Sequence, residues 1–298
     1  MSFAVSILEQ GLIYGILALG IYITYKILDF PDLTVDGSFP LGAAVTALMI
    51  TKGANPYLTL PAAFAAGVAA GICTGLIHVK CKVRDLLSGI IMMTALWTIN
   101  LRVAGTANVP LFSQKTIFKN DTLDKLLPSG FSAYSTLLII LIIALIVKII
   151  LDLYLNTKSG YLLRAVGDND KLVTAMAKDE GNVKILGLAI ANGLCSLAGC
   201  IFCQEERVFE ISSGTGAMVI GLASVIIGMK LLKRFNSVKA TTAVITGSEV
   251  YKACVSIAIA MGMAASDLKL ITAVLFLVIL VVSNRTEGKV KIAGKKGK

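Results

Sequence analysis

Residues 157–199 read TKSGYLLRAVGDNDKLVTAMAKDEGNVKILGLAIANGLCSLAG and form the longest polar interruption in the second half of the chain. The stretch opens with Lys158, Gly160 and Arg164, which indicate a short basic turn. A long apolar run resumes after Lys184. The polar part therefore separates two hydrophobic segments and decides how they are connected.

A short amphipathic helix is predicted inside this stretch. Asp168 or Asn169 can cap the helix, and Gly181 can end it. A helix of about three turns cannot cross a bilayer, so its apolar face must rest on other helices and its polar face must meet water or another protein. The apolar face comprises Leu172, Val173 and Met176, and Lys171 and Lys178 lie on the other face.

The composition is that of a multi-pass membrane protein. Hydrophobic residues make up 56% of the 298 residues, charged residues only 15%, and the mean hydropathy is +0.82. We expect an all-α fold of about eight helical segments, because helices satisfy their own backbone groups in lipid. Residues 1–284 are predicted to form one transmembrane domain, with residues 157–184 as its cytoplasmic loop and 285–298 as a basic cytoplasmic tail.

The formal net charge of +10 follows from the expected topology. Most of the 28 Lys and Arg residues fall on one side when the loops are assigned by the positive-inside rule. That side is cytoplasmic, and the N-terminus and residues 105–133 are predicted to lie outside. The basic excess is thus a topology signal with some attraction to anionic membrane lipid, and it does not indicate nucleic-acid binding.

Motifs for catalysis are missing from the sequence. It contains no G-x-x-x-x-G-K-[ST] loop for a nucleotide phosphate, no G-x-S-x-G elbow and no H-E-x-x-H pair. We therefore predict that the chain is not an enzyme. If ATP drives the protein, another chain hydrolyses it.

The six cysteines and the single histidine lie within or next to apolar segments. Cys195, Cys200 and Cys203 have the C-x4-C-x2-C spacing of a plant-type iron–sulfur site, with Cys254 as a conceivable fourth ligand. We favour packing roles for them, because small polarizable thiols are common on apolar helices. His78 is interpreted as an interfacial side chain, and no cofactor or metal site is predicted.

Two short glycine-rich segments, 38–51 and 213–228, interrupt the series of full-length spans. Each is shorter than the roughly 20 residues that cross a bilayer, and the two run in opposite directions. Such a pair is typical of inverted repeats and points to a substrate path, with a chance arrangement of glycines as the alternative. The residues assigned to a candidate translocation pathway are Asp36, Trp97, Asn100, Gly214, Gly216, Glu249 and Lys252.

Several charged residues at or between apolar segments have two interpretations. Glu249 and Lys252 are three residues apart, so we expect them to share a helix face and neutralise each other, either lining a pathway or fixing helix packing. Asp29, Asp32 and Asp36 precede the first short segment, where helix capping is favoured over substrate contact.

Two regions carry a resemblance to a known family. The pattern S-G-x-x-x-R-A-V-G-D-N at 159–169, followed by a short helix and a Gly/Ala-rich span, resembles the cytoplasmic coupling loop of permease subunits of bacterial ABC importers of the branched-chain amino acid and ribose type. Residues 11–25 and the turn DFPDLTVDGSFPLG at 29–42 resemble the start of the same permeases, although the usual His-Gly pair of the family is absent.

The resemblance implies a permease subunit in the bacterial plasma membrane. It would work as two permease copies with two ABC ATPase subunits and an extracytoplasmic, lipid-anchored or periplasmic, substrate-binding protein. The turn at 29–40 is most similar to a branch linked to aromatic amino acids, so an amino acid is the expected substrate. The implied coupling residues are Gly160, Arg164, Ala165, Gly167, Asp168, Leu172 and Met176.

An ion-gradient-driven secondary transporter is the alternative function. It would use Glu249 and Lys252 as a proton or sodium relay, and inverted repeats suit both functions. The cytoplasmic amphipathic helix favours the ABC importer, because a stand-alone carrier does not need such a helix.

Overall fold

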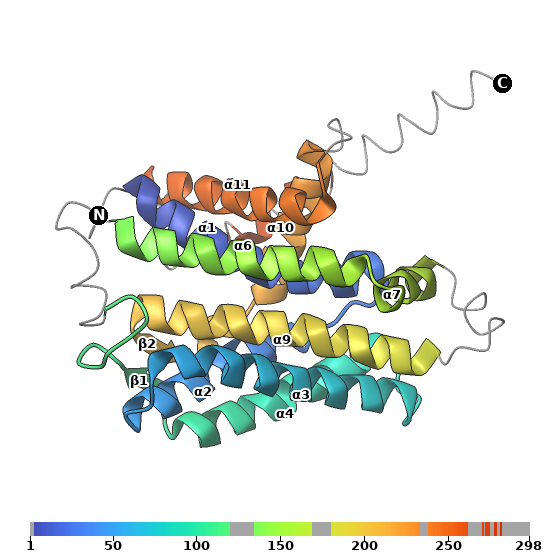
Figure 1. Ribbon diagram of the computed structural model, residues 1–298, viewed down its shortest axis with the longest axis horizontal. Coiled ribbons are helices and arrows are strands. Elements are labelled where there is room, and N and C mark those ends of the chain that lie inside the picture. The colour runs from blue at the N-terminus through green and yellow to red at the C-terminus, as the bar shows by residue number, and fades with distance from the viewer. Residues whose placement is uncertain are drawn as a thin grey trace.

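The structure is a computed structural model that describes residues 3–119, 134–168, 180–232 and 238–261, and positions 270, 272–274, 277, 278 and 281. This part of the chain is almost entirely helical, which confirms the predicted all-α polytopic class. Within it, seven helices are long and apolar enough to cross a membrane (Figure 1). They run Phe3–Ile27, Pro56–Val79, Asp85–Ala104, Ser135–Leu155, Glu180–Glu206, Ile211–Leu231 and Ala240–Ala260.

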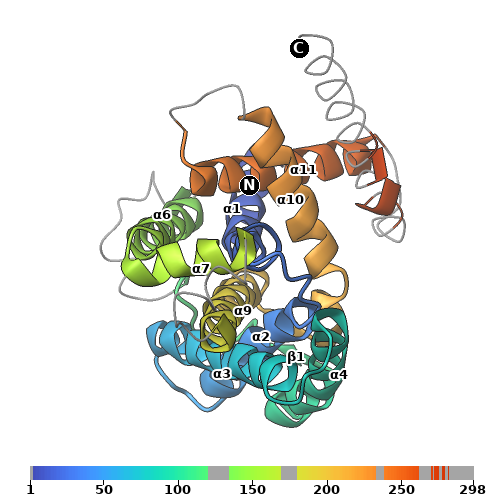
Figure 2. The same cartoon turned by 90° about the vertical axis from the view of Figure 1, so that its right-hand side faces the viewer.

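Two helices form the centre of the bundle. They are α1 (Phe3–Ile21), which continues into a π-helical turn at Tyr22–Ile27, and α9 (Glu180–Glu206). Most side chains of both are buried, because they are surrounded on several sides. Figure 2 shows α2 to α4 on one side of α9, and α6, α10 and α11 around α1. The outer helices are α3 (Thr59–Val79), α4 (Asp85–Ala104), α6 (Ser135–Leu155) and α11 (Ala240–Ala260).

The close contact between α3 and α9 depends on glycine. A Cβ atom at Gly67 would meet the carbonyl of Asn192, one at Gly71 would meet the carbonyl of Leu188, and one at Gly75 would meet a side chain of α9. The three glycines are four residues apart and lie on one face of α3. The absence of side chains there lets the two backbones touch.

The two predicted short segments correspond to the two shortest apolar helices among the described residues. They are α2 (Val35–Thr51, 17 residues) and α10 (Ala217–Leu231, 15 residues), and the 3-10 turn Ile211–Gly214 precedes α10. The end of α2 packs beside β2, whereas Gly228 near the end of α10 packs on the start of α11. The two helices therefore run in opposite directions, as predicted, although both begin at residues other than those expected.

Two short strands close one end of the bundle. β1 (Asn108–Pro110) pairs antiparallel with β2 (Val208–Glu210). Three acidic residues lie at this end: Glu205 and Glu206 belong to the last turn of α9, and Glu210 lies in β2. The pairing joins segments about 100 residues apart, so short-range sequence patterns do not show it.

The two ends of the bundle carry different elements. The start of α1 and both strands lie at one end, and α7 (Lys158–Asp168) and the turn between α3 and α4 lie at the other (Figure 1). The sequence places these groups on opposite sides of the membrane, and the structure separates them in the same way. That the α7 end faces the cytoplasm stays a prediction from charge.

Candidate translocation and coupling sites

The N-terminal ends of α2 and α10 are joined by one carboxylate. Asp36 lies in the first turn of α2, and its Oδ2 and Oδ1 accept hydrogen bonds from the backbone N–H groups of Gly216 (3.0 Å) and Met218 (2.8 Å). A carboxylate at this place satisfies free N–H groups and suits the positive end of the helix dipole. The capping interpretation therefore applies to Asp36, but the helix that it caps is the second short helix.

A second carboxylate holds the start of α2 against α9. The carboxylate of Asp32 accepts hydrogen bonds from the backbone N–H of Thr34 (2.9 Å) and from Nδ2 of Asn192 (2.7 Å). The hydroxyl of Ser38 donates to Oδ1 of the same Asn192 at 2.7 Å. All four residues are buried, so the network fixes one arrangement of the start of α2 against α9. The sequence carries no short-range signal for Asn192, because its partners are far away along the chain.

A cavity of about 320 Å³ lies beside the junction of the two short helices. Asn100 of α4 is buried there, and its Nδ2 donates to the carbonyl of Gly37 at 3.0 Å. Its Oδ1 has no hydrogen-bond partner among the described residues. The cavity is lined by Asp36, Gly37, Pro40, Met93, Thr94, Trp97, Asn100 and Thr215.

The structure brings most of the predicted pathway residues together at this cavity. Asp36, Trp97 and Asn100 line it, and Gly214 and Gly216 flank the lining residue Thr215. A side chain at Gly214 would collide with the backbone carbonyl of Asp36, and Gly216 has a φ of 87°, a conformation that favours glycine. The two glycines are therefore required by the shape of the junction.

Glu249 and Lys252 lie elsewhere, between α11 and α1, and the predicted ion pair between them is absent from the described residues. Nζ of Lys252 lies 4.7 Å from the ring centroid of Tyr14, with Glu205 and Glu206 as the acidic groups that act on it. The carboxylate of Glu249 packs on Gly11 and has no hydrogen-bond partner there. A spacing of three residues was not enough to predict an ion pair, because Glu249 packs on Gly11 of α1 and Lys252 packs on Tyr14.

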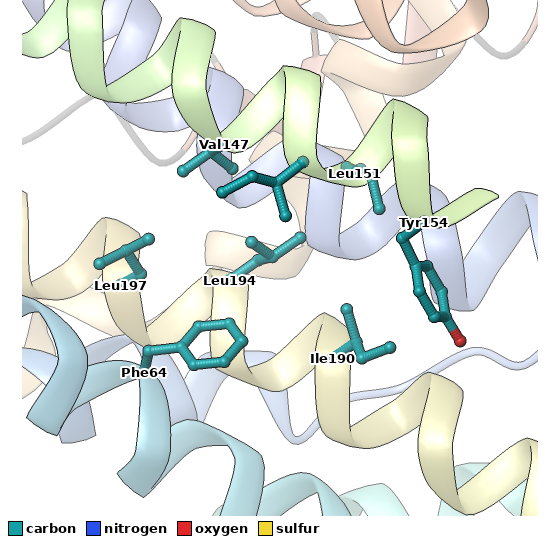
Figure 3. Close-up of a pocket in the computed structure, with 8 residues that line it drawn as sticks. Phe64, Val147, Leu151, Tyr154, Ile190, Leu194 and Leu197 are labelled. Atoms are coloured by element: carbon teal, nitrogen blue, oxygen red, sulfur yellow. The ribbon is translucent and has the colours of Figure 1, made fainter. Parts of the chain in front are cut away.

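A second cavity, of about 370 Å³, lies between α3, α6 and α9. Figure 3 shows its wall, in which Val147, Leu151 and Tyr154 of α6 face Ile190 and other residues of α9. The wall is almost wholly apolar, and the Tyr154 hydroxyl is hydrogen-bonded to Ser159. This groove suits hydrocarbon and cannot stabilise a charged solute.

At the other end of the bundle, α7 rests on the protein by one face. Leu163 and Val166 are buried in the main hydrophobic core, and Ala165 packs against that core. The opposite face exposes Lys158, Tyr161, Arg164 and Asp168. The basic turn predicted at 158–164 is therefore helical, because Leu163 and Val166 give the segment a buried stripe.

Two of the predicted coupling residues face inward. A Cβ atom at Gly167 would meet the carbonyl of Ile27 at the end of α1, and one at Gly160 would meet the backbone of Leu155 at the end of α6. These glycines hold α7 directly against two membrane helices. Leu172 and Met176, the other predicted coupling residues, lie outside the described residues, as does Asn169. Gly181, the expected helix end, lies in the first turn of α9.

The side chains considered for metal binding have other contacts. Cys195, Cys200 and Cys203 are buried free thiols in α9, whereas Cys254 is exposed on α11. Nδ1 of His78 is 2.8 Å from the carbonyl of Val83, and its ring meets the ring of Phe30 edge to face. Among the described residues, no cluster of three His, Cys, Asp or Glu side chains could hold a metal ion.

One polar contact was missed at the sequence level. Asp152, near the end of α6, accepts hydrogen bonds from Lys148 (3.2 Å), Lys239 (3.3 Å) and the hydroxyl of Thr241 (2.6 Å). These bonds connect α6 to the start of α11. The spacing of four residues from Lys148 to Asp152 was the only local signal, and it could not identify the partners on α11.

The fold and the junction define a class of protein. It is a multi-pass membrane protein in which two short helices of opposite direction meet beside a cavity that Asp36 and Asn100 line, as in transporters with broken helices.

Comparison with known proteins identifies the family. The chain belongs to the branched-chain amino acid transport system permease component family, whose model matches residues 3–283. It is 42% identical to the tyrosine transport system permease protein of Clostridioides difficile (strain R20291) over 284 residues, which cover 95% of this chain and 92% of that protein. The chain is thus the permease component of a membrane transport system.

More distant relatives have related names. The chain is 31% identical over 239 residues to the probable branched-chain amino acid transport permease protein LivH of Methanocaldococcus jannaschii, covering 75% of this chain and 74% of that protein. It is 25% identical over 231 residues to the ribose import permease protein RbsC of Escherichia coli (strain K12), and the match covers 75% of this chain and 68% of that protein. No solved structure matches the chain significantly.

Proposed function

We propose that this chain is the membrane subunit of an ABC importer for an amino acid, with an aromatic amino acid favoured. Two copies would work with two ATPase subunits that hydrolyse ATP and with an extracytoplasmic substrate-binding protein or lipoprotein. The observation that carries the proposal is the 42% identity, over nearly the whole chain, to a permease named for tyrosine transport.

The junction of α2 and α10 supports a path for a polar solute. The cavity is lined by the charged carboxylate of Asp36 and by Asn100, whose side-chain oxygen has no hydrogen-bond partner among the described residues. Asn100 belongs to α4, and most residues of that helix are not buried inside the protein. Polar groups of this kind are costly in contact with lipid. The cavity therefore suits a water-filled path shared with a second permease copy.

The position of α7 supports coupling to an ATPase subunit. Its exposed face offers Tyr161, Arg164 and Asp168, and a guanidinium is well suited to a carboxylate or carbonyl on a partner. Its inner face touches Ile27 through Gly167, so a push on α7 would reach the end of α1. The segment after Ile27 leads to Asp32 and the start of α2, which provides a short physical connection to the cavity.

Reconstitution in proteoliposomes tests this function. The complex of permease, ATPase subunits and binding protein should take up radiolabelled L-tyrosine only with ATP, and uptake should persist when an uncoupler collapses the ion gradient. A complex whose ATPase subunits bind but do not hydrolyse ATP is the control, and it should show no uptake. Uptake by this chain alone that is abolished by the uncoupler would contradict the proposal and favour an ion-driven carrier.

A further inference from the structure

The buried carboxamide of Asn100 has one unused side. Its Nδ2 donates to the carbonyl of Gly37, which assigns the amide orientation and leaves Oδ1 as an acceptor. Asn100 is fully buried, and its Oδ1 has no partner among the described residues, although the side chain lines the cavity. A buried acceptor without a donor is unfavourable, so a ligand that brings an N–H group would gain from meeting it.

The charge in the same cavity is negative. Among the described residues, Asp36 is the only charged one in the lining, and each of its carboxylate oxygens accepts one backbone N–H. A carboxylate oxygen has room for a further hydrogen bond, so Asp36 can still attract a donor-rich cation. In the part of the chain that the structure describes, neither lysine nor arginine lines the cavity, which makes it a poor site for an anion.

Apolar surface covers the remaining wall. Trp97 is 46% exposed, and Met93 and Pro40 lie in the same lining. The volume of about 320 Å³ is at the lower end of the range for small-molecule sites, which is roughly 300 to 1,000 Å³. An indole offers a large flat face on which an aromatic ring can stack.

We propose that this cavity binds an amino acid with an aromatic side chain during its passage, with Oδ1 of Asn100 and the Asp36 carboxylate receiving the ammonium group and Trp97 packing on the ring. The proposal rests on the proposed function, because it takes an amino acid as the transported solute. It adds a binding site inside the permease itself, separate from that of any extracytoplasmic binding protein.

The chain provides its own probe for this site. Trp97 is the single tryptophan in the sequence, so its fluorescence, excited where tyrosine does not absorb, reports on the cavity alone. The full-length permease in liposomes that contain no other protein should show a saturable fluorescence change with L-tyrosine and with L-phenylalanine. Desaminotyrosine keeps the ring and the carboxylate but lacks the ammonium group, and it should give no saturable change. No response to either amino acid, or an equal response to desaminotyrosine, would overturn the proposal.

Variants assign the contacts. Asn100→Leu should weaken binding of radiolabelled L-tyrosine about tenfold, the usual loss for a hydrogen bond to a charged group. Trp97→Leu should weaken binding, whereas Trp97→Phe should retain most of it. Thr98→Val is the matched control, because Thr98 lies on the exposed face of α4 and outside the lining, and its binding should be unchanged. Loss of binding in Thr98→Val as well, or unchanged binding in Asn100→Leu, would contradict the assignment.

Failure of this site and failure of the proposed function give different results. Each variant is first checked for a wild-type elution profile and melting temperature, and the ligand series on the unmutated protein remains decisive if Asn100→Leu does not fold. ATP-dependent uptake by the complex together with no ligand response from Trp97 would remove the site and keep the importer. A saturable response from Trp97 together with uptake that ignores ATP would keep the site and remove the importer.

Discussion

Asp36 connects the two short helices α2 and α10, and Gly214 packs closely on its backbone at the same junction. The carboxylate is part of α2 but satisfies N–H groups of α10, so one residue sets both the position and the charge of the junction. The sequence identified Asp36 as a capping residue from its place before an apolar run. It could not identify the capped helix, because that depends on a contact across about 180 residues.

Removal of the Asp36 carboxylate should therefore destabilise the junction. We expect Asp36→Ala to lower the free energy of unfolding by about 1 kcal/mol, as for other N-cap losses, and to stop uptake. Asp36→Asn keeps one acceptor oxygen, so its free energy of unfolding should lie between those of Asp36→Ala and the unmutated protein. Thermal unfolding in detergent and uptake in proteoliposomes measure these effects. Asp29→Asn, which changes an exposed carboxylate in the same connection, is the control and should match the unmutated protein.

Glu249 and Lys252 should act independently, because each has different neighbours on α1. Lys252→Met should cost about 1 kcal/mol through the lost contact with Tyr14. Glu249→Gln removes a charge that has no hydrogen-bond partner in the described residues and should leave stability unchanged or increase it. In a double-mutant cycle of unfolding free energies the two effects should add within about 0.5 kcal/mol. A larger coupling energy would show that the two side chains do meet.

Some helical segments were predicted correctly from the sequence and others were not. The two short glycine-rich segments were recognised because their length and composition are properties of each segment alone. The start of α7 was predicted as a turn, because Gly160 and nearby polar residues suggested one, whereas the protein core supplies a partner for Leu163 and Val166. Tertiary burial overrides local preference in such a segment.

The two faces of α7 should respond differently to substitution. Gly167→Ala places a methyl group on the carbonyl of Ile27 and should cost roughly 1 to 3 kcal/mol of stability, as overpacking does. Arg164→Glu changes an exposed side chain, so stability should stay within about 0.5 kcal/mol while ATPase binding weakens. Thermal unfolding and co-purification with the ATPase measure the two effects.

Lys80→Glu is the matched control for Arg164→Glu. Lys80 is exposed at the same end of the bundle but lies outside α7. Reversing the charge of Lys80 should leave ATPase binding unchanged. Equal loss of ATPase binding in both variants would show that general charge at this end, and not the face of α7, attracts the partner.

For the protein as a whole, hydropathy and charge were sufficient to predict the all-α multi-pass class. Both depend on the composition of each segment, which determines whether the segment inserts into a bilayer and in which orientation. The pairing of β1 with β2 and the contact between Asp32 and Asn192 could not be predicted, because each joins residues far apart in the chain. The cavity at Asn100 lies between these cases: Asp36, Trp97 and Asn100 were named from the sequence, but the other lining residues and the arrangement required the fold.

The orientation of the whole bundle can be tested directly. The β1 end carries few basic residues and the α7 end carries many, so the positive-inside rule places α7 in the cytoplasm. Reporter fusions after Gln114 and after Asn156 should therefore give opposite signals, with Gln114 outside. A fusion after Lys82 should match the one after Asn156, because the α3–α4 turn lies at the same end as α7. Equal signals at Gln114 and Asn156 would contradict the orientation and, with it, the docking of an ATPase on α7.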